Sequence, residues 1–227
     1  MRQICRYLPL LALLPFCVPL ASAQSSVDFM LGFGTAFDSS NGGGIDSALS
    51  ANAYGSCVPS TAVASGDIYC QTNPKLSGFF LGIGGDVMLH KGFGIGAEIN
   101  VQPAKSNYGP LQYRETFYDF NGIFAPINTK RVTLELQGGI GGARTSFSIN
   151  ESECAGTVVC SSENEPIGNE SHFQVHVGVG VSLFVTDHIF VRPSFDFHYV
   201  PGFTSQFGRD SVPEATVWLG YNFGDRQ

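Results

Sequence analysis

The chain has 227 residues, of which 28 are glycine, and its 19 acidic residues outnumber its 12 basic ones, for a net charge of −7 at pH 7. A nucleic-acid-binding protein needs a basic footprint, so this charge balance argues against a nucleic-acid partner. After the first residues, no stretch approaches the ~18 consecutive apolar residues of a transmembrane helix. The glycines follow no collagen period and form no low-complexity block.

Residues 1–23 have the features of a secretory signal peptide. Arg2 and Arg6 give a positive start, residues 8–14 are mostly leucine, and Ala-Ser-Ala at 21–23 is a small-residue cleavage site. A membrane anchor is the alternative, but the apolar run is short for a spanning helix and prolines interrupt it. We therefore expect export and removal of this segment.

The remaining segment, 24–227, is predicted to be a single domain with four cysteines in two sequence-local pairs. An exported protein folds in an oxidising compartment, where such pairs form disulfides. A metal site is the alternative, and it is disfavoured because no histidine lies near either pair. The predicted disulfides are Cys57–Cys70 and Cys154–Cys160.

The first half of the domain alternates strands with connections of unequal length. Residues 27–37 place apolar side chains at every second position, as a strand with one apolar face does. Residues 38–75 form a long polar stretch without helical or strand period. The hairpin at 78–102 then turns at His90-Lys91-Gly92, and its second face carries glycine, Asp86 and Glu98. Each arm has the length of a tilted strand that crosses a bilayer.

The second half repeats the pattern. Strands are predicted at 113–125 and 131–147, then a second long polar loop at about 150–171. Further strands follow at 173–185, 189–199 and 213–223, although Pro193 cannot donate to a central ladder. The acidic loop is expected to be solvated, with divalent-cation binding as the alternative; its glutamates are Glu151, Glu153, Glu163, Glu165 and Glu170.

The predicted fold is all-β, an eight-stranded antiparallel up-and-down transmembrane β-barrel with short periplasmic turns and long extracellular loops. Short and long connections alternate along the chain, so an up-and-down meander gathers all short turns at one end. The apolar faces lack charge over their central parts, as contact with hydrocarbon requires. A soluble β-sandwich is the alternative, but it has no reason to sort its loops in this way.

The second face of these strands mixes glycine with acids and amides, which suits a narrow lumen. We expect a buried polar network there, because buried charges need partners. Arg192 is the first partner predicted for Asp86 and Glu98, with Arg131 at a turn as the second. The predicted network comprises Asp28, Asp86, Glu98, Asp119, Glu135, His176, Arg192, Asp196 and His198.

The opening strand VDFMLGFGTAF at 27–37, the glycine-alternating strands and the closing TVWLGYNF at 216–223 resemble a known family. The likeness covers 24–227 and is to the small outer-membrane β-barrel domain of Gram-negative bacteria, similar to the outer membrane protein A type without its periplasmic domain. This resemblance implies residence in the cell outer membrane and contact with outer-membrane lipids. It also implies the barrel-insertion machinery as a partner during biogenesis, and it names no extracellular partner.

The expected role is structural or in surface interaction, with long loops displayed outside and no catalytic residue, cofactor or metal. A narrow pore for small solutes is the alternative. A lipid-modifying enzyme is a further alternative, since Ser194 shares a face with Asp196 and His198. Such an enzyme needs a nucleophile beside a base and an oxyanion site. A lumenal network of ion pairs explains the same residues more simply.

Overall fold

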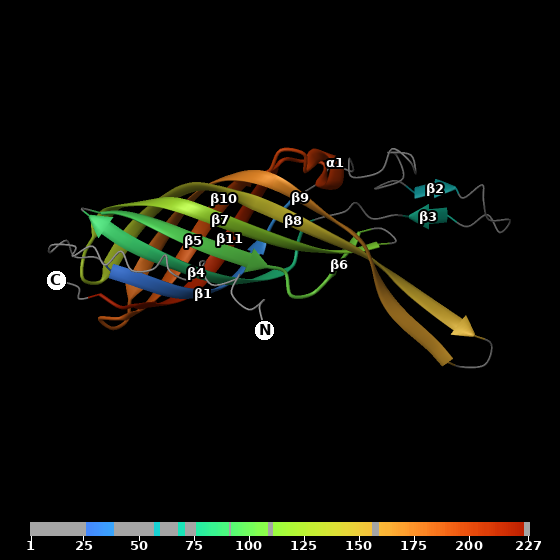
Figure 1. The fold of residues 1–227 in the computed structure, drawn as a ribbon, viewed down its shortest axis with the longest axis horizontal. Coiled ribbons are helices and arrows are strands. Elements are labelled where there is room, and N and C mark those ends of the chain that lie inside the picture. Colours follow the sequence, from blue (N-terminus) through green and yellow to red (C-terminus); the bar gives the residue numbers. More distant parts are fainter. Residues whose placement is uncertain are drawn as a thin grey trace, which may run out of the picture.

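Figure 1 shows the computed structural model, which describes residues 26–38, 57–59, 68–70, 76–90, 92–108, 111–155 and 159–224. Eight antiparallel strands close into a barrel. They are β1 (Ser26–Ala36), β4 (Phe79–His90), β5 (Phe93–Val101), β7 (Leu111–Asn128), β8 (Val132–Ala155), β9 (Val159–Phe184), β10 (Ile189–Tyr199) and β11 (Ser211–Asn222). No helix in these ranges is long and apolar enough to span a membrane.

The barrel has the predicted up-and-down topology. Each of its strands pairs with the next one along the chain, and β1 returns to pair with β11, with Leu31 opposite Leu219. The two strands of the first predicted hairpin are β4 and β5, and β5 goes on to pair with β7. A closed ladder leaves its backbone groups paired within the wall, which hydrocarbon contact demands.

Short and long connections lie at opposite ends of the barrel (Figure 1). The tight turns follow β4, β7 and β9, and the first needs glycine, because Gly92 has φ +81° and a Cβ there would lie 2.6 Å from the carbonyl oxygen of Ala125. The other end carries β6 (Ser106–Tyr108), helix α1 (Thr204–Phe207) and the small β2–β3 hairpin (Cys57–Pro59 and Ile68–Cys70). The chain therefore sorts its connections as the sequence predicted.

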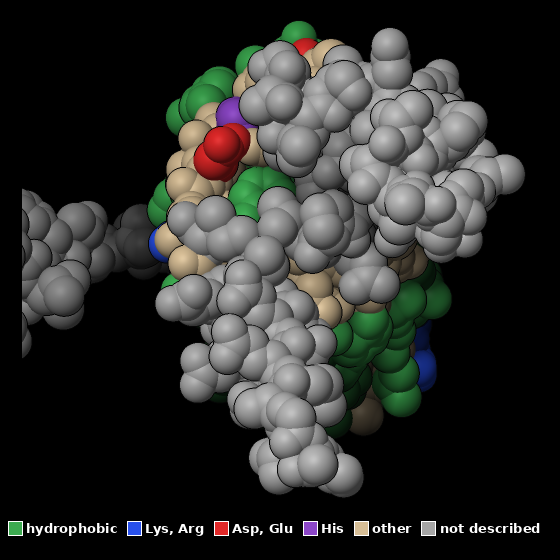
Figure 2. Space-filling view, turned by 90° about the vertical axis from the view of Figure 1, so that its right-hand side faces the viewer, with side chains coloured by type: hydrophobic (Ala, Val, Ile, Leu, Met, Phe, Trp, Pro, Cys, Tyr) green, Lys and Arg blue, Asp and Glu red, His purple; other side chains and the backbone are tan. Residues whose placement is uncertain are grey.

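The outer wall of the barrel is apolar and the inner wall is polar or small, which inverts the pattern of a soluble barrel. Phe120 is 68% exposed and its cross-strand neighbour Ile140 is 57% exposed, so neither is packed against protein. Viewed from the loop end, hydrophobic side chains line much of the visible outer wall (Figure 2). Outward-facing members of this belt include Phe29, Leu31, Ile83, Ile95, Ile99, Phe120, Ile140, Val177, Phe195 and Leu219.

The second predicted polar loop is wrong over most of its length, because β8 and β9 continue through it. Their ladder runs on from Ile149 opposite Glu165 to Ala155 opposite Val159, and the extended hairpin projects from the loop end (Figure 1). The prediction failed because alternation marks a strand only where one face is apolar. Beyond the barrel both faces of a hairpin meet water, so the ladder persists without that pattern.

Pro193 lies in the middle of β10, on the outer face. Pairing with β11 continues through Arg192 and Pro193, whereas pairing with β9 is recorded on either side of these two residues, at Val191 and Ser194. A proline has no N–H to donate, so a local gap in the hydrogen bonding to one neighbouring strand is expected. The predicted strand 189–199 nevertheless forms with those bounds.

Candidate functional site: the filled lumen

Strand register brings several predicted network residues face to face inside the barrel. Asp28 lies directly opposite Asp86, and Glu98 lies opposite Asp119. His176 lies opposite His198. Like charges directly across a ladder destabilise it, so these acid pairs require cations or proton donors from other strands. All nine predicted residues lie on the inner face and are buried.

Arg192 supplies the main positive charge. Its Nη1 donates to Asp86 Oδ2 at 2.7 Å and to Glu135 Oε2 at 2.6 Å, and the residue is 1% exposed. The guanidinium also lies 5.7 Å from the ring centroid of Trp218, within cation–π range. Arg192 therefore joins three strands across the lumen. Arg131, the second predicted partner, lies exposed at the turn before β8 and forms no ion pair within the described ranges.

His176 bridges two further side chains of the network. Its Nδ1 lies 3.0 Å from Asn121 Oδ1, and its Nε2 lies 3.0 Å from Asp196 Oδ1. The Asn121 amide nitrogen donates to Glu98 Oε1 at 3.1 Å, which fixes the amide oxygen toward the ring. Both ring nitrogens thus face side-chain oxygens, which hold the ring between β7 and β10. Glu98 is held by Asn121 and not, as predicted, directly by Arg192.

Asp196 is the most heavily hydrogen-bonded carboxylate of the network. Besides the histidine contact, it accepts from Gln137 Nε2 at 3.0 Å and from Ser194 Oγ at 2.9 Å. The Ser194 hydroxyl in turn accepts from Trp218 Nε1 at 3.2 Å. Ser194 therefore donates to an acid and accepts from an indole, and within the described part of the chain its buried hydroxyl makes no hydrogen bond to a histidine.

His198 closes the network toward the loop end. Its ring stacks on His176 with centroids 4.8 Å apart and on Phe117 at 4.9 Å. Its Nε2 lies 3.2 Å from Glu214 Oε2, and Asp119 accepts from Gln174 Nε2 at 2.6 Å. At the turn end, the Asn222 amide donates to Asp28. The polar layer thus spans the lumen from β1 to β11.

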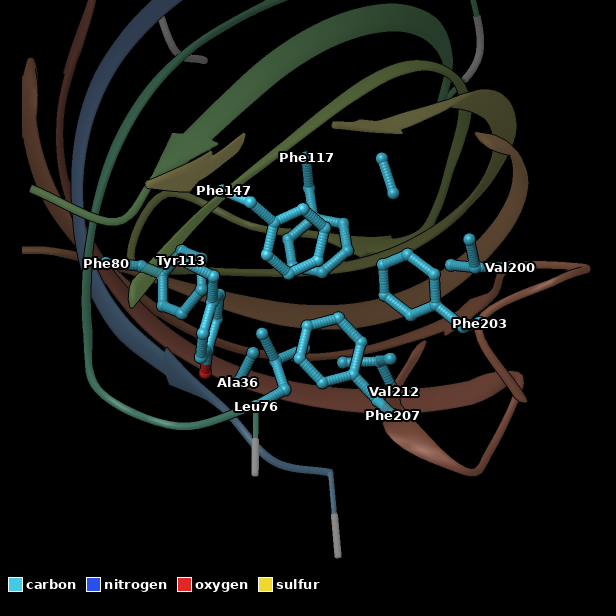
Figure 3. Close-up of a cluster of buried hydrophobic side chains, with 11 residues drawn as sticks. Ala36, Leu76, Phe80, Tyr113, Phe117, Phe147, Val200, Phe203, Phe207 and Val212 are labelled. Carbon is cyan, nitrogen blue, oxygen red and sulfur yellow. The ribbon is translucent and has the colours of Figure 1, made fainter. Parts of the chain in front are cut away.

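Apolar side chains close the lumen on both sides of this layer. At the loop end, aromatic rings converge across the mouth, with Phe203 and Phe207 contributed by the α1 segment (Figure 3). The full mouth cluster is Ala36, Leu76, Phe80, Tyr113, Phe117, Ala143, Phe147, Val200, Phe203, Phe207 and Val212. At the turn end, Met30, Phe184, Phe190 and Trp218 form a floor cluster. The lumen is therefore filled along its axis.

Several contributors were missed from the sequence. Glu214 and Trp218 occupy inward positions of the predicted last strand. The alternation itself puts them on the other face of that strand from Ala215 and Val217. Glu115, also inward, accepts from Thr145 Oγ1 at 2.6 Å. Helix α1 could not be predicted from a hydrophobic period, since four helical residues are too few to show one.

The cysteine pairs are aligned by backbone register. Cys57 lies opposite Cys70 in the β2–β3 hairpin, and Cys154 lies opposite Cys160 near the tip of β8–β9. The two disulfides stay predictions. The described residues hold no group of three or more His, Cys, Asp or Glu side chains suited to a metal ion. The signal peptide, 1–23, lies outside the described residues.

Two aspartates at the loop end have shifted pKa values. Asp38, at the end of β1, is buried, and burial raises its pKa to about 6 against a weaker opposing effect of Arg209. Asp210 accepts from the Thr204 backbone N–H at 2.7 Å and from its hydroxyl at 2.8 Å. These bonds hold the pKa of Asp210 below its usual value and tie α1 to the start of β11.

No protein-family model and no curated protein matches the sequence. Among solved structures, Ail, the attachment invasion locus protein of Yersinia pestis in complex with the heparin analogue sucrose octasulfate, is 10% identical, with a TM-score of 0.51 over 88% of this chain and 99% of that one. Neisserial surface protein A is 12% identical, with a TM-score of 0.50 over 88% of this chain and 96% of that one. This chain has the fold of a small outer-membrane β-barrel. At these identities the likeness shows the architecture alone.

Proposed function

We propose that the chain is an integral outer-membrane β-barrel with a sealed lumen and a structural or surface-interaction role. The observation that carries this proposal is the filled axis: an aromatic mouth, a buried ion network and an apolar floor lie in series inside an apolar outer wall. An eight-stranded barrel has an interior just wide enough for its own side chains. The parts available to partners are then the projecting loops and the β8–β9 hairpin.

The proposal includes export by the predicted signal peptide, contact with outer-membrane lipids, and insertion by the barrel-assembly machinery. It excludes a catalytic role. In support, Ser194 donates to Asp196 and accepts from Trp218, while both nitrogens of His176 face other acceptors. A serine nucleophile must also be reached by its substrate, and Ser194 is buried inside the filled lumen.

Planar-bilayer recording tests the sealed lumen against the pore alternative. Purified protein inserted into a bilayer is expected to give a flat current trace across moderate voltages, because charged and aromatic side chains occupy the axis. Steady, reproducible current steps that scale with salt concentration would show a conducting lumen and reject the sealed barrel.

A further inference from the structure

Two arginines lie side by side on the outer wall of β7 and β8, toward the loop end of the barrel. Arg144 lies directly opposite Thr116, and Arg114 lies two residues further along β7. Both share the outward alternation of Tyr118 and Ile140, and both are exposed. Diagonal neighbours of this kind have Cα atoms about 7–8 Å apart, within reach of long side chains. The two guanidinium groups can therefore meet on one ligand.

These arginines differ from Arg192 in having no carboxylate. Within the described ranges neither Arg114 nor Arg144 forms an ion pair, and Arg114 Nη2 only donates to the Pro103 carbonyl oxygen at 3.1 Å. The row of Arg144 on the outer wall continues to Val101 on β5 and to Ser171 on β9, and the row of Arg114 continues to Ser146 and Asn169, all uncharged. Among the described side chains these two outward rows are thus cationic, although acids outnumber bases 19 to 12 in the whole chain.

The height of the pair relative to the apolar belt indicates what it meets. Tyr118 lies opposite Gly142, and its ring lies where a Cβ at residue 142 would clash, so it covers β8 at the edge of the belt. Aromatic rings of this kind sit at the membrane–water interface. With ~3.4 Å per residue and a tilt of about 40°, Arg144 lies roughly 5 Å and Arg114 roughly 10 Å above Tyr118. That is the depth of the head-group layer.

We propose that Arg114 and Arg144 together bind a phosphate of a lipid head group in the leaflet at the loop end. The inference rests on the proposed function, which places the belt in the membrane and the loops outside. Guanidinium groups bind phosphate through paired, charge-assisted hydrogen bonds, and such bonds strengthen where lipid displaces water. The site is continuous with the apolar belt, so the acyl chains of the same lipid lie against Tyr118 and Ile140.

Native mass spectrometry of the full chain in detergent tests the site, with the diphosphorylated lipid A disaccharide as the probe. The wild-type protein is expected to retain this lipid, and Arg114→Gln with Arg144→Gln is expected to weaken its binding about tenfold or more. Dephosphorylated lipid A is expected to bind the wild-type protein as weakly as the phosphorylated form binds the variant. The matched control, Lys130→Gln with Arg131→Gln, removes two exposed charges at the turn end and is expected to bind normally.

Equal retention by the wild-type protein and the Arg114/Arg144 variant would overturn the inference, as would equal binding of dephosphorylated lipid. Displacement of the lipid by inorganic phosphate at the lipid's own concentration would show a free-phosphate site and overturn the lipid assignment. Heat-modifiable gel migration of the same samples separates the two proposals. A wild-type protein that shows no such migration would contradict the proposed membrane barrel itself. A heat-modifiable barrel whose lipid binding does not depend on Arg114 and Arg144 would contradict only the lipid site.

Discussion

Arg192 is the residue on which the electrostatics of the lumen depend most. It faces Asp86 and Glu135 at hydrogen-bond distance, in a lumen where several further carboxylates are buried. Taking charges out of water is costly, and removing one partner leaves the others uncompensated. The lumen is therefore stable only while Arg192 and its buried carboxylate partners are all present.

Replacing Arg192 by Met is expected to lower the free energy of unfolding by about 3–5 kcal/mol, since it strands two buried carboxylates. Urea unfolding in micelles, followed by the fluorescence midpoint of Trp218, the single tryptophan, measures this loss. Adding Asp86→Asn and Glu135→Gln is expected to recover most of it. A single Arg192→Met variant within 1 kcal/mol of the wild-type protein would contradict this reading.

Asp38 makes stability at the loop end depend on pH. Its pKa is about 6 in the folded state and 3.8 when exposed, so the folded state binds more protons between these values. The free energy of unfolding therefore falls as the pH rises from about 4 to about 6. At higher pH the protein keeps the whole of this loss in stability. Asp38→Asn is expected to flatten this slope and to stabilise the protein at pH 8 by at most about 3 kcal/mol. Urea titrations of the wild-type protein and the Asp38→Asn variant measure the free energy of unfolding at each pH. The same pH dependence in both would show that Asp38 is not the titrating group.

Among the elements, the strands were predictable from the sequence and helix α1, which closes the mouth of the barrel, was not. A period of two fixes the face of each residue, which is why Asp86, Asp196 and Arg192 could all be placed inside. Which residues then touch depends on register and on the shear of the closed barrel. The sequence carries no cross-strand signal for the Asn121–Glu98 contact or for Gln206, which donates to Glu170 across the mouth.

The α1 segment closes the mouth, and it does so above an ion network that is itself closed. Phe203→Ala with Phe207→Ala is expected to destabilise the loop between β10 and β11 and to increase its cleavage by protease, because each lost ring leaves a cavity. Conductance is expected to stay at zero, since Arg192 and the Phe184–Phe190 floor remain. The control Phe195→Ala removes an outward ring and is expected to leave loop cleavage unchanged. Steady current through the double variant would show that α1 alone seals the lumen.

At the scale of the whole molecule, the apolar belt distinguishes a membrane barrel from a soluble one. Phe120→Arg places a charge inside the belt, one outward position further from the loop end than Tyr118, and is expected to cost about 1–3 kcal/mol in a lipid bilayer. Asn169→Arg, at the loop end of β9 and level with the exposed Arg114, is the matched control and is expected to cost less than about 1 kcal/mol. Unfolding titrations in lipid vesicles compare the two. Equal costs for the two changes would mean that Phe120 does not face hydrocarbon.

A sealed lumen and a lipid site at the loop end both require a closed barrel held in an outer membrane. Gel migration of the outer-membrane fraction, run with and without boiling, tests it most directly. The folded barrel is expected to migrate faster before boiling and at its full mass of 24.3 kDa, less any removed signal peptide, after it. Recovery of folded protein in the detergent-free soluble fraction, with no shift on boiling, would contradict the membrane barrel.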